Sequence, residues 1–158
     1  MTQTFDIAVI GLGAMGSAAL YQSARRGASV VGIDRFHPPH VHGSTHGQTR
    51  ITRRAIGEGE VYVPLATRSH EIWRELESAS GKSLLHEVGS IIISERDDDV
   101  QRPGRTGFIR RSIAAAERYG IAHEVLDAAE IRRRFPHLTP SDAEIGYYEP
   151  GGGYVIPE

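Results

Sequence analysis

The hydrophobic pattern at the start of the chain alternates short apolar runs with one stretch of good helix formers. Phe5–Ile10 is rich in β-branched side chains and ends at Gly11, which predicts a buried strand. Ala14–Arg26 predicts a helix, and Gly27 suits the position that follows a helix C-terminus. Ser29–Asp34 predicts a second buried strand. The opening residues therefore predict a right-handed β–α–β unit with parallel strands.

The pattern changes after this unit. His37–Gly59 contains two adjacent prolines and several glycines, which predicts a long loop with a short helical piece. Tyr62–Ser80 predicts a helix with Pro64 in its first turn, Gly81 after its end and Trp73 in the core. The remaining predicted elements are a strand at Val88–Ser94, an exposed connection at Glu95–Gly107, a helix at Phe108–Tyr119, a strand at Ala122–Leu126, a helix begun by a capping box of Asp127 and Glu130, and strands at Ile145–Tyr148 and Tyr154–Ile156.

The order of these elements predicts an α/β protein of two parts. Residues 1–80 are expected to form the N-terminal part of a dinucleotide-binding domain. Residues 81–158 alternate strands and helices differently and are expected to begin a second, α+β substrate domain. A doubly wound sheet has further βα units, so we expect the chain to be the front part of a longer fold.

Composition narrows the class of protein. The chain has 158 residues, 39% of them apolar, and a net charge of −2, which lacks the basic excess of a nucleic-acid-binding domain. The absence of cysteine excludes a disulfide framework and a thiol nucleophile. No apolar run approaches the length of a membrane span. The histidines of the 37–46 segment have no defined ligand geometry, so we predict no metal site and expect a cytoplasmic protein that binds small molecules.

The glycine-rich turn is the clearest sign of a binding site. Gly11, Gly13 and Gly16 form GxGxxG between the first strand and the first helix. The three glycines permit a tight turn, approach of a pyrophosphate to the backbone and close helix–strand packing. Asp34 ends the second strand, where its carboxylate can accept hydrogen bonds from ribose hydroxyls. The negative charge of Asp34 disfavours a dinucleotide with a 2′-phosphate, but the neighbouring Arg35 weakens this argument. These residues therefore leave FAD and NAD open.

The Gly43–Arg54 segment brings arginines together with hydroxyls and a histidine. Guanidinium groups in such a loop can stabilise an anionic flavin or bind a substrate carboxylate through two hydrogen bonds. The alternative is a solvated basic loop, since runs of charge usually face water.

The chain resembles the monomeric sarcosine oxidase and N-methyltryptophan oxidase family of FAD-dependent enzymes. The resemblance covers the whole chain but only the first portion of the family's length. It rests on the glycine turn and on Asp34, Pro38-Pro39-His40, Gly43-Ser44, His46-Gly47, Thr49-Arg50, Arg53, Gly57-Glu58-Gly59, Tyr62-Val63-Pro64-Leu65 and Trp73, and more weakly on Glu149-Pro150 and Gly153.

The resemblance implies a Rossmann-like FAD-binding domain and assigns roles to individual residues. The implied cofactor-binding residues are Gly11, Gly13, Gly16, Asp34, Arg35, Ser44 and Thr49. His46 and Arg50 would lie closest to the isoalloxazine ring, and Arg53 would bind the substrate carboxylate. Gly57-Glu58-Gly59 would belong to a mobile flap over the site. Thr45, Gln48 and Ile56 stand where the family commonly has His, Asp and Tyr, so the choice of amine stays open.

The implied reaction is oxidation of a secondary N-methyl amino acid by O₂ to formaldehyde, the primary amino acid and hydrogen peroxide. The 158 residues alone are expected to be incomplete for turnover. One alternative is an NAD(P)-dependent dehydrogenase of the 3-hydroxyisobutyrate type, whose GLGxMG signature is matched by Gly11–Gly16. Another is an inactive nucleotide-binding fragment. Bound flavin colour would separate the first reading from both alternatives.

Overall fold

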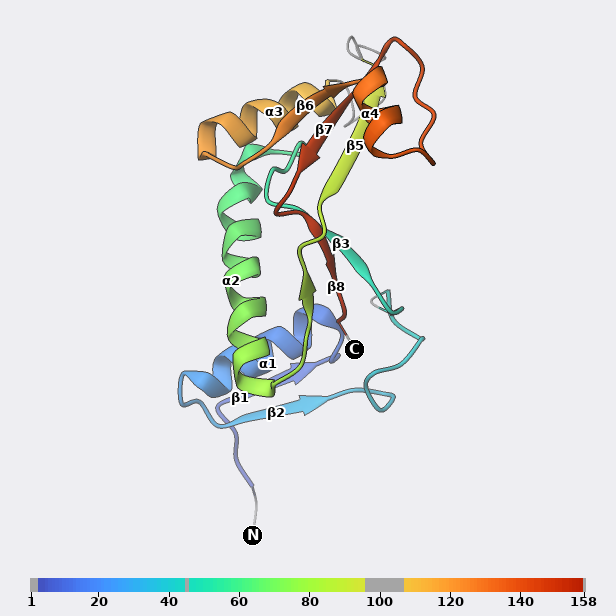
Figure 1. Ribbon diagram of the computed structural model, residues 1–158. Coiled ribbons are helices and arrows are strands. Elements are labelled where there is room, and N and C mark those ends of the chain that lie inside the picture. Colours follow the sequence, from blue (N-terminus) through green and yellow to red (C-terminus); the bar gives the residue numbers. More distant parts are fainter. Residues whose placement is uncertain (1–2, 45, 96–106, 158) are drawn as a thin grey trace. The chain divides into compact units, whose positions relative to one another are not determined.

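The computed structural model describes residues 3–44, 46–95 and 107–157 (Figure 1). Its chain forms two compact units, a first unit up to Gln48 and a second unit of Thr49–Pro157. The boundary between compact units thus falls well before residue 80, and the assignment of 1–80 and 81–158 to two functional domains stays a prediction. The predicted connection at Glu95–Gly107 lies almost entirely outside the described residues.

The first unit contains the predicted β–α–β arrangement. Strand β1 (Ile7–Ile10) and strand β2 (Val30–Ile33) are parallel and paired in register from Ile7↔Val30 to Ile10↔Ile33, with helix α1 (Ala14–Arg25) between them in the chain. Gly27 follows the helix with φ +88°, a backbone conformation that side chains with a Cβ rarely adopt. The predicted strands and helix of this unit are confirmed.

The second unit holds two three-stranded antiparallel sheets, β3–β8–β4 and β5–β7–β6 (Figure 1). Its elements in chain order are β3 (Arg50–Thr52), the 3-10 helix η1 (Glu60–Tyr62), α2 (Val63–Ser80), β4 (Leu85–His86), β5 (Ser90–Glu95), α3 (Phe108–Tyr119), β6 (Glu124–Asp127), α4 (Ala128–Arg134), β7 (Glu144–Glu149) and β8 (Gly153–Val155).

Most predicted elements of the second unit are confirmed, and three details are wrong. The predicted helical piece within His37–Gly59 is absent from its described residues, and β3 forms instead because it pairs with the distant β8. The two-residue strand β4 was too short to predict. Trp73 is only partly buried, so its predicted core position is not reached.

The capping box at α4 is half formed. The carboxylate of Asp127 accepts a hydrogen bond from the backbone N–H of Glu130 at 2.8 Å, as predicted. The Glu130 carboxylate does not complete the box, because it accepts hydrogen bonds from Arg133 at 2.6 and 3.0 Å. The helix ends at Arg134, before Pro136, where the predicted stop falls.

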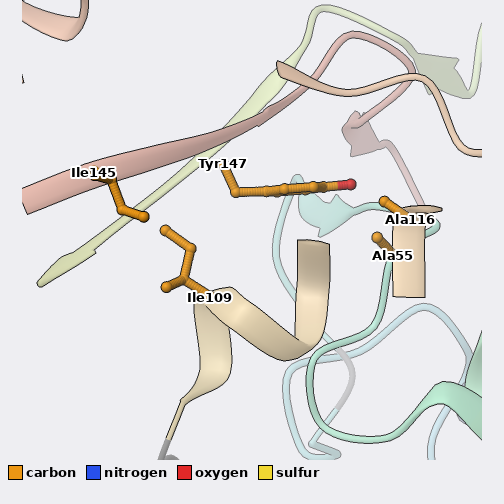
Figure 2. Close-up of a cluster of buried hydrophobic side chains, with 5 residues drawn as sticks. All are labelled: Ala55, Ile109, Ala116, Ile145 and Tyr147. Carbon is orange, nitrogen blue, oxygen red and sulfur yellow. The ribbon is translucent and has the colours of Figure 1, made fainter. Parts of the chain in front are cut away.

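The core of the second unit lies on the two faces of β7. Because successive strand residues point to opposite faces, Ile145 and Tyr147 pack with α3, where they join Ile109, Ala116 and the loop residue Ala55 (Figure 2). On the other face, the ring of Tyr148 lies 5.8 Å from that of Phe135, just beyond α4. No helix in the described part of the chain is both long enough and apolar enough to cross a membrane.

Candidate functional site

The glycine-rich turn connects β1 to α1 through close backbone contacts. Gly11 has φ +87°, and its N–H donates to the Ile33 carbonyl of β2 at 2.7 Å. A Cβ added at Gly16 would lie 1.7 Å from the Gly11 carbonyl oxygen, far inside van der Waals contact. The absence of a side chain at Gly16 therefore allows α1 to begin directly against the turn.

The N-terminus of α1 is open on the side of the turn. Gly13 is the N-cap residue, no side chain caps the helix, and its first turn carries no acidic residue. A Cβ added at Gly13 would meet nothing within 4 Å. Backbone N–H groups and the positive end of the helix dipole thus border open space, an arrangement that suits a diphosphate.

A pocket of about 500 Å³ lies within the first unit, beside this turn. Its lining residues are Ile10, Gly11, Ile33, Asp34, Arg35, Phe36, His40 and His42. The rings of Phe36 and His42 are stacked with centroids 4.0 Å apart, and the guanidinium carbon of Arg35 lies 5.4 Å from the centre of the Phe36 ring. Flat rings and apolar side chains beside one carboxylate match the chemistry of a nucleoside.

The Asp34 carboxylate ties the turn to the end of β2. Its Oδ2 accepts from the Leu12 N–H at 2.6 Å, and its Oδ1 accepts from the Phe36 N–H at 2.9 Å. These two backbone hydrogen bonds, that from Phe36 first, lower the pKa of the Asp34 carboxyl from 3.8 to about 2. The carboxylate is therefore ionised at neutral pH, and its oxygens have further lone pairs for ribose hydroxyls.

His40 is a partner of Asp34 that the sequence analysis did not predict as a site residue. Its Nε2 lies 3.2 Å from Asp34 Oδ1, and its Nδ1 accepts from the His42 N–H at 3.3 Å. In a neutral imidazole, Nε2 then carries the proton and donates to Asp34. The sequence did contain a signal for His40, because Pro38-Pro39-His40 is one of the strings that support the family resemblance.

The residues predicted to follow the flavin fall in both units. Ser44 and His46 lie on the exposed end of the first unit, and Thr45 lies outside the described residues. Thr49 and Arg50 begin the second unit, where Arg50 opposes Val155 of β8 and its Nη1 donates to the Thr49 carbonyl at 2.8 Å. Their contacts with a flavin stay predictions.

Arg53 directly follows β3, and its charged side chain is partly buried. Its Nη2 donates to both carboxylate oxygens of Glu58, at 2.8 and 2.9 Å, and its guanidinium carbon lies 5.5 Å from the centre of the Phe108 ring. Its Nε is buried and has no hydrogen-bond partner among the described residues. The Arg53 side chain is 20% exposed and that of Glu58 is 55% exposed. The carboxylate that holds this arginine is thus the more accessible partner.

The Gly57-Glu58-Gly59 segment is attached at its first residue to α3. The Nε of Arg111 donates to the Gly57 carbonyl at 2.8 Å. A Cβ at Gly57 would lie 2.4 Å from the Ser112 hydroxyl, so only glycine packs this closely. The predicted mobility of this segment stays a prediction, and Glu58 is the residue that it presents to Arg53.

A second pocket, of about 490 Å³, lies in the second unit around His70, Arg54 and Arg74. The two guanidinium groups are already paired, Arg54 with Glu87 at 2.8 Å and Arg74 with Glu77 at 2.7 Å. His70 is buried, and its Nε2 lies 2.8 Å from the Thr52 hydroxyl. Within residues 3–44, 46–95 and 107–157, no group of three or more His, Cys, Asp or Glu side chains could hold a metal ion.

We expect His70 to make the stability of the second unit depend on pH. Burial, followed by the positive charge of Arg54, lowers the pKa of His70 below its ordinary value of 6.5. Below pH 6.5 the unfolded chain therefore binds a proton that the folded chain resists, and the free energy of unfolding falls as the pH decreases toward the folded-state pKa. Urea titrations across this range should show the loss in the unsubstituted protein and a smaller one in His70→Gln. His137→Gln, at an exposed position, is the control and should behave like the unsubstituted protein.

Comparison with known proteins places the chain in a family. A family model described as FAD dependent oxidoreductase matches residues 6–158. Over 158 residues the chain is 43% identical to the monomeric sarcosine oxidase of Streptomyces avermitilis, and over 154 residues it is 38% identical to the N-methyl-L-tryptophan oxidase of Yersinia pestis. These alignments cover 100% and 98% of the chain but only 39% of each relative.

Solved structures show the same fold. NikD, an unusual amino acid oxidase essential for nikkomycin biosynthesis, aligns with a TM-score of 0.78 and 30% identity over 98% of this chain and 38% of its own. L-proline dehydrogenase from P. horikoshii aligns with a TM-score of 0.74 and 22% identity over 99% of this chain and 39% of its own.

The chain belongs to the FAD-dependent oxidoreductases. The predicted α/β fold, the predicted relationship to the sarcosine and N-methyltryptophan oxidases, and FAD as the cofactor are thereby confirmed. The open helix N-terminus and the pocket beside Asp34 fit a dinucleotide of this kind. The alternative of an NAD(P)-dependent 3-hydroxyisobutyrate-type dehydrogenase finds no support in these matches.

Proposed function

We propose that this chain carries the adenosine-binding turn and the substrate-binding arginine of an oxidase of secondary N-methyl amino acids, such as sarcosine or N-methyltryptophan. The observation that carries the proposal is Arg53, a cation shielded by Phe108 whose present partner is the exposed carboxylate of Glu58. A substrate carboxylate can take the place of Glu58, because both present two oxygens to the same guanidinium group. The proposed class of substrate follows from the relatives, a sarcosine oxidase and an N-methyl-L-tryptophan oxidase.

The residues of the first unit would hold the cofactor by its adenosine diphosphate half. Gly11, Gly13 and Gly16 would place the pyrophosphate at the N-terminus of α1, and Asp34 would accept hydrogen bonds from the ribose. Arg35 lines the pocket in which the nucleoside would lie. Ser44, His46, Thr49 and Arg50 would follow the cofactor toward its isoalloxazine ring.

The protein groups would orient the amine and set the local charge. FAD, when bound, would supply the two-electron oxidation of the carbon–nitrogen bond, with O₂ as the final electron acceptor and hydrogen peroxide as its product. The resulting imine would be hydrolysed by water to formaldehyde and the primary amino acid. Arg53 would fix the substrate carboxylate. Near the reacting carbon, Arg50 would offer positive charge and His46 would offer a hydrogen-bond donor.

The first test is the visible absorption spectrum of the purified chain before and after addition of FAD. Flavin bands that remain after gel filtration would support the proposal. A colourless protein that binds NAD would overturn it, and a protein that binds neither would be the inactive fragment.

Replacement of Arg53 should separate binding of the carboxylate from the rest of the reaction. In flavin-loaded protein, Arg53→Met should raise the dissociation constant for sarcosine or N-methyltryptophan by about 10- to 100-fold, which corresponds to the loss of a hydrogen-bonded charge pair. An N-methyl amine without a carboxylate should bind with unchanged affinity. Titration of each amine into the protein under nitrogen, followed by the change in the flavin absorption bands, measures both dissociation constants.

Arg68→Met is the matched control for this replacement, because Arg68 lies on α2 with its side chain 51% exposed and pairs with Glu71 and Glu75. It should leave both substrates unaffected. Equal losses for both amines in Arg53→Met would contradict the proposed role of Arg53.

A further inference from the structure

A buried carboxylate lies at the end of β7, directly behind the segment that carries Arg53. Glu149 is 0% exposed. Its Oε1 accepts from the Arg54 N–H at 2.7 Å, and its Oε2 accepts from the Ala55 N–H at 3.1 Å. The Tyr147 hydroxyl donates to the same Oε2 at 2.9 Å. Three donors thus hold one carboxylate that has no access to water.

These hydrogen bonds fix the backbone on the C-terminal side of Arg53. On its N-terminal side, Thr52 is the last residue of β3 and pairs with Gly153 of β8. The methyl group of Ala55 is fully buried in the cluster around Tyr147 (Figure 2). The backbone of Arg53 is therefore held on both sides by hydrogen bonds. Its guanidinium group can move by rotation about the side-chain bonds.

We infer that Glu149 is a positioning residue for Arg53, which it holds in place for a carboxylate ligand by binding the two backbone N–H groups that follow it. The inference rests on the proposed function, in which Arg53 binds the carboxylate of the substrate. It assigns to Glu149 a part in the recognition of amino acids as opposed to simple amines.

Arg53 and Glu149 both influence the hydroxyl group of Tyr147. Burial, and next the negative charge of Glu149 and its hydrogen bond, raise the pKa of the Tyr147 hydroxyl, while the positive charge of Arg53 opposes the shift. Arg53 and Glu149 therefore act on the same buried hydroxyl group. The buried carboxylate binds the backbone segment that directly follows Arg53.

Glu149→Gln is the sharpest test, because it keeps the shape of the side chain and changes its charge and its hydrogen bonding. One amide NH₂ must then face a backbone N–H or the Tyr147 hydroxyl, so part of the contact with Arg54 and Ala55 is lost. In flavin-loaded protein we expect the dissociation constant for the N-methyl amino acid to rise about tenfold, with that of the amine without a carboxylate unchanged. Glu144→Gln, the same change at the other end of β7, should alter neither.

A second readout does not depend on activity. The side-chain Nε–H signal of Arg53 in a nitrogen–proton NMR spectrum, assigned by its loss in Arg53→Met, should shift in Glu149→Gln and stay in place in Glu144→Gln. If Glu149→Gln does not fold, Tyr147→Phe removes only one of the three donors and should shift the same signal by a smaller amount.

The outcomes separate this inference from the proposed function. An unchanged Arg53 signal and an unchanged dissociation constant for the N-methyl amino acid in Glu149→Gln would overturn the inference. Equal losses of affinity for both amines would also overturn it, because they indicate a structural role alone. If Arg53→Met leaves the discrimination between the amines intact while Glu149→Gln moves the Arg53 signal, the positioning contact stands and the proposed role of Arg53 fails.

Discussion

Gly16→Ala is expected to abolish FAD binding at concentrations that saturate the unsubstituted protein. The added Cβ would lie 1.7 Å from the Gly11 carbonyl oxygen and 2.9 Å from its carbon, so α1 can no longer begin against the turn. Both neighbours are backbone atoms, which cannot rotate away as a side chain can. A cost of roughly 3 kcal/mol or more, equivalent to at least about 100-fold in FAD affinity, is expected. Quenching of flavin fluorescence measures the affinity.

Gly13→Ala is the control for the fold, because it adds the same methyl group at a position where the backbone tolerates it. Gly13 has φ −68°, which any residue adopts, and a Cβ there meets nothing within 4 Å. Circular dichroism should therefore show an unchanged fold, while FAD affinity falls, because the new methyl group occupies the space next to the pyrophosphate. Tight FAD binding by Gly13→Ala would show that the cofactor does not approach this backbone. Tight binding by Gly16→Ala would show that the contact with Gly11 is not required.

Asp34→Ala is expected to weaken FAD binding by about 10- to 100-fold, by removing the hydrogen bonds of the ribose and the support of the turn together. The Leu12 and Phe36 N–H groups both donate to this carboxylate, so they lose their partner in the variant.

The same carboxylate should make the stability of the unit depend on pH. Because the pKa of Asp34 is lowered to about 2, its contribution to stability is present above pH 4 and is lost as the pH falls from about 4 to about 2. Equilibrium titration with FAD at neutral pH measures the affinity, and urea unfolding between about pH 4 and about pH 2 measures the stability.

Asp6→Ala supplies the comparison within the same unit. The Asp6 carboxylate accepts from the Ser29 N–H at 2.8 Å, at the opposite end of the same pair of strands. Its loss should lower stability and leave FAD affinity nearly unchanged. If both variants weaken FAD equally, Asp34 acts through the stability of the unit and not through the ribose.

The nucleotide-binding part of the site could be predicted from sequence because its determinants are local. The turn, the helix and Asp34 lie within one β–α–β unit, and the positive φ of Gly11 and the close packing at Gly16 both require glycine. The helices α2 and α3 were predicted for the same reason, since Gly81 and Gly120 mark the C-terminal end of each helix.

The part of the site around Arg53 could not be predicted in the same way. Strand β3 exists because β8 pairs with it, and a three-residue strand has too little pattern of its own. One signal in the sequence could have identified Glu149 as a buried carboxylate, and the sequence analysis did not use it. It follows Ile145 and Tyr147 at every second position of a strand, so the alternation itself places a carboxylate on the buried face. Its partners, the N–H groups of Arg54 and Ala55, carry no sequence signal.

The spacing of these hydrogen bonds along the chain has a consequence for biosynthesis. The Leu12–Asp34 bond joins residues 22 apart, whereas the Arg54–Glu149 bond joins residues 95 apart. At about 5 to 20 residues per second, the ribosome takes on the order of 10 s to add the residues between Asp34 and Glu149. A nascent chain thus contains a complete nucleotide-binding turn well before it can hold its arginine in place, so cofactor capture can precede the assembly of the substrate-binding residues during translation.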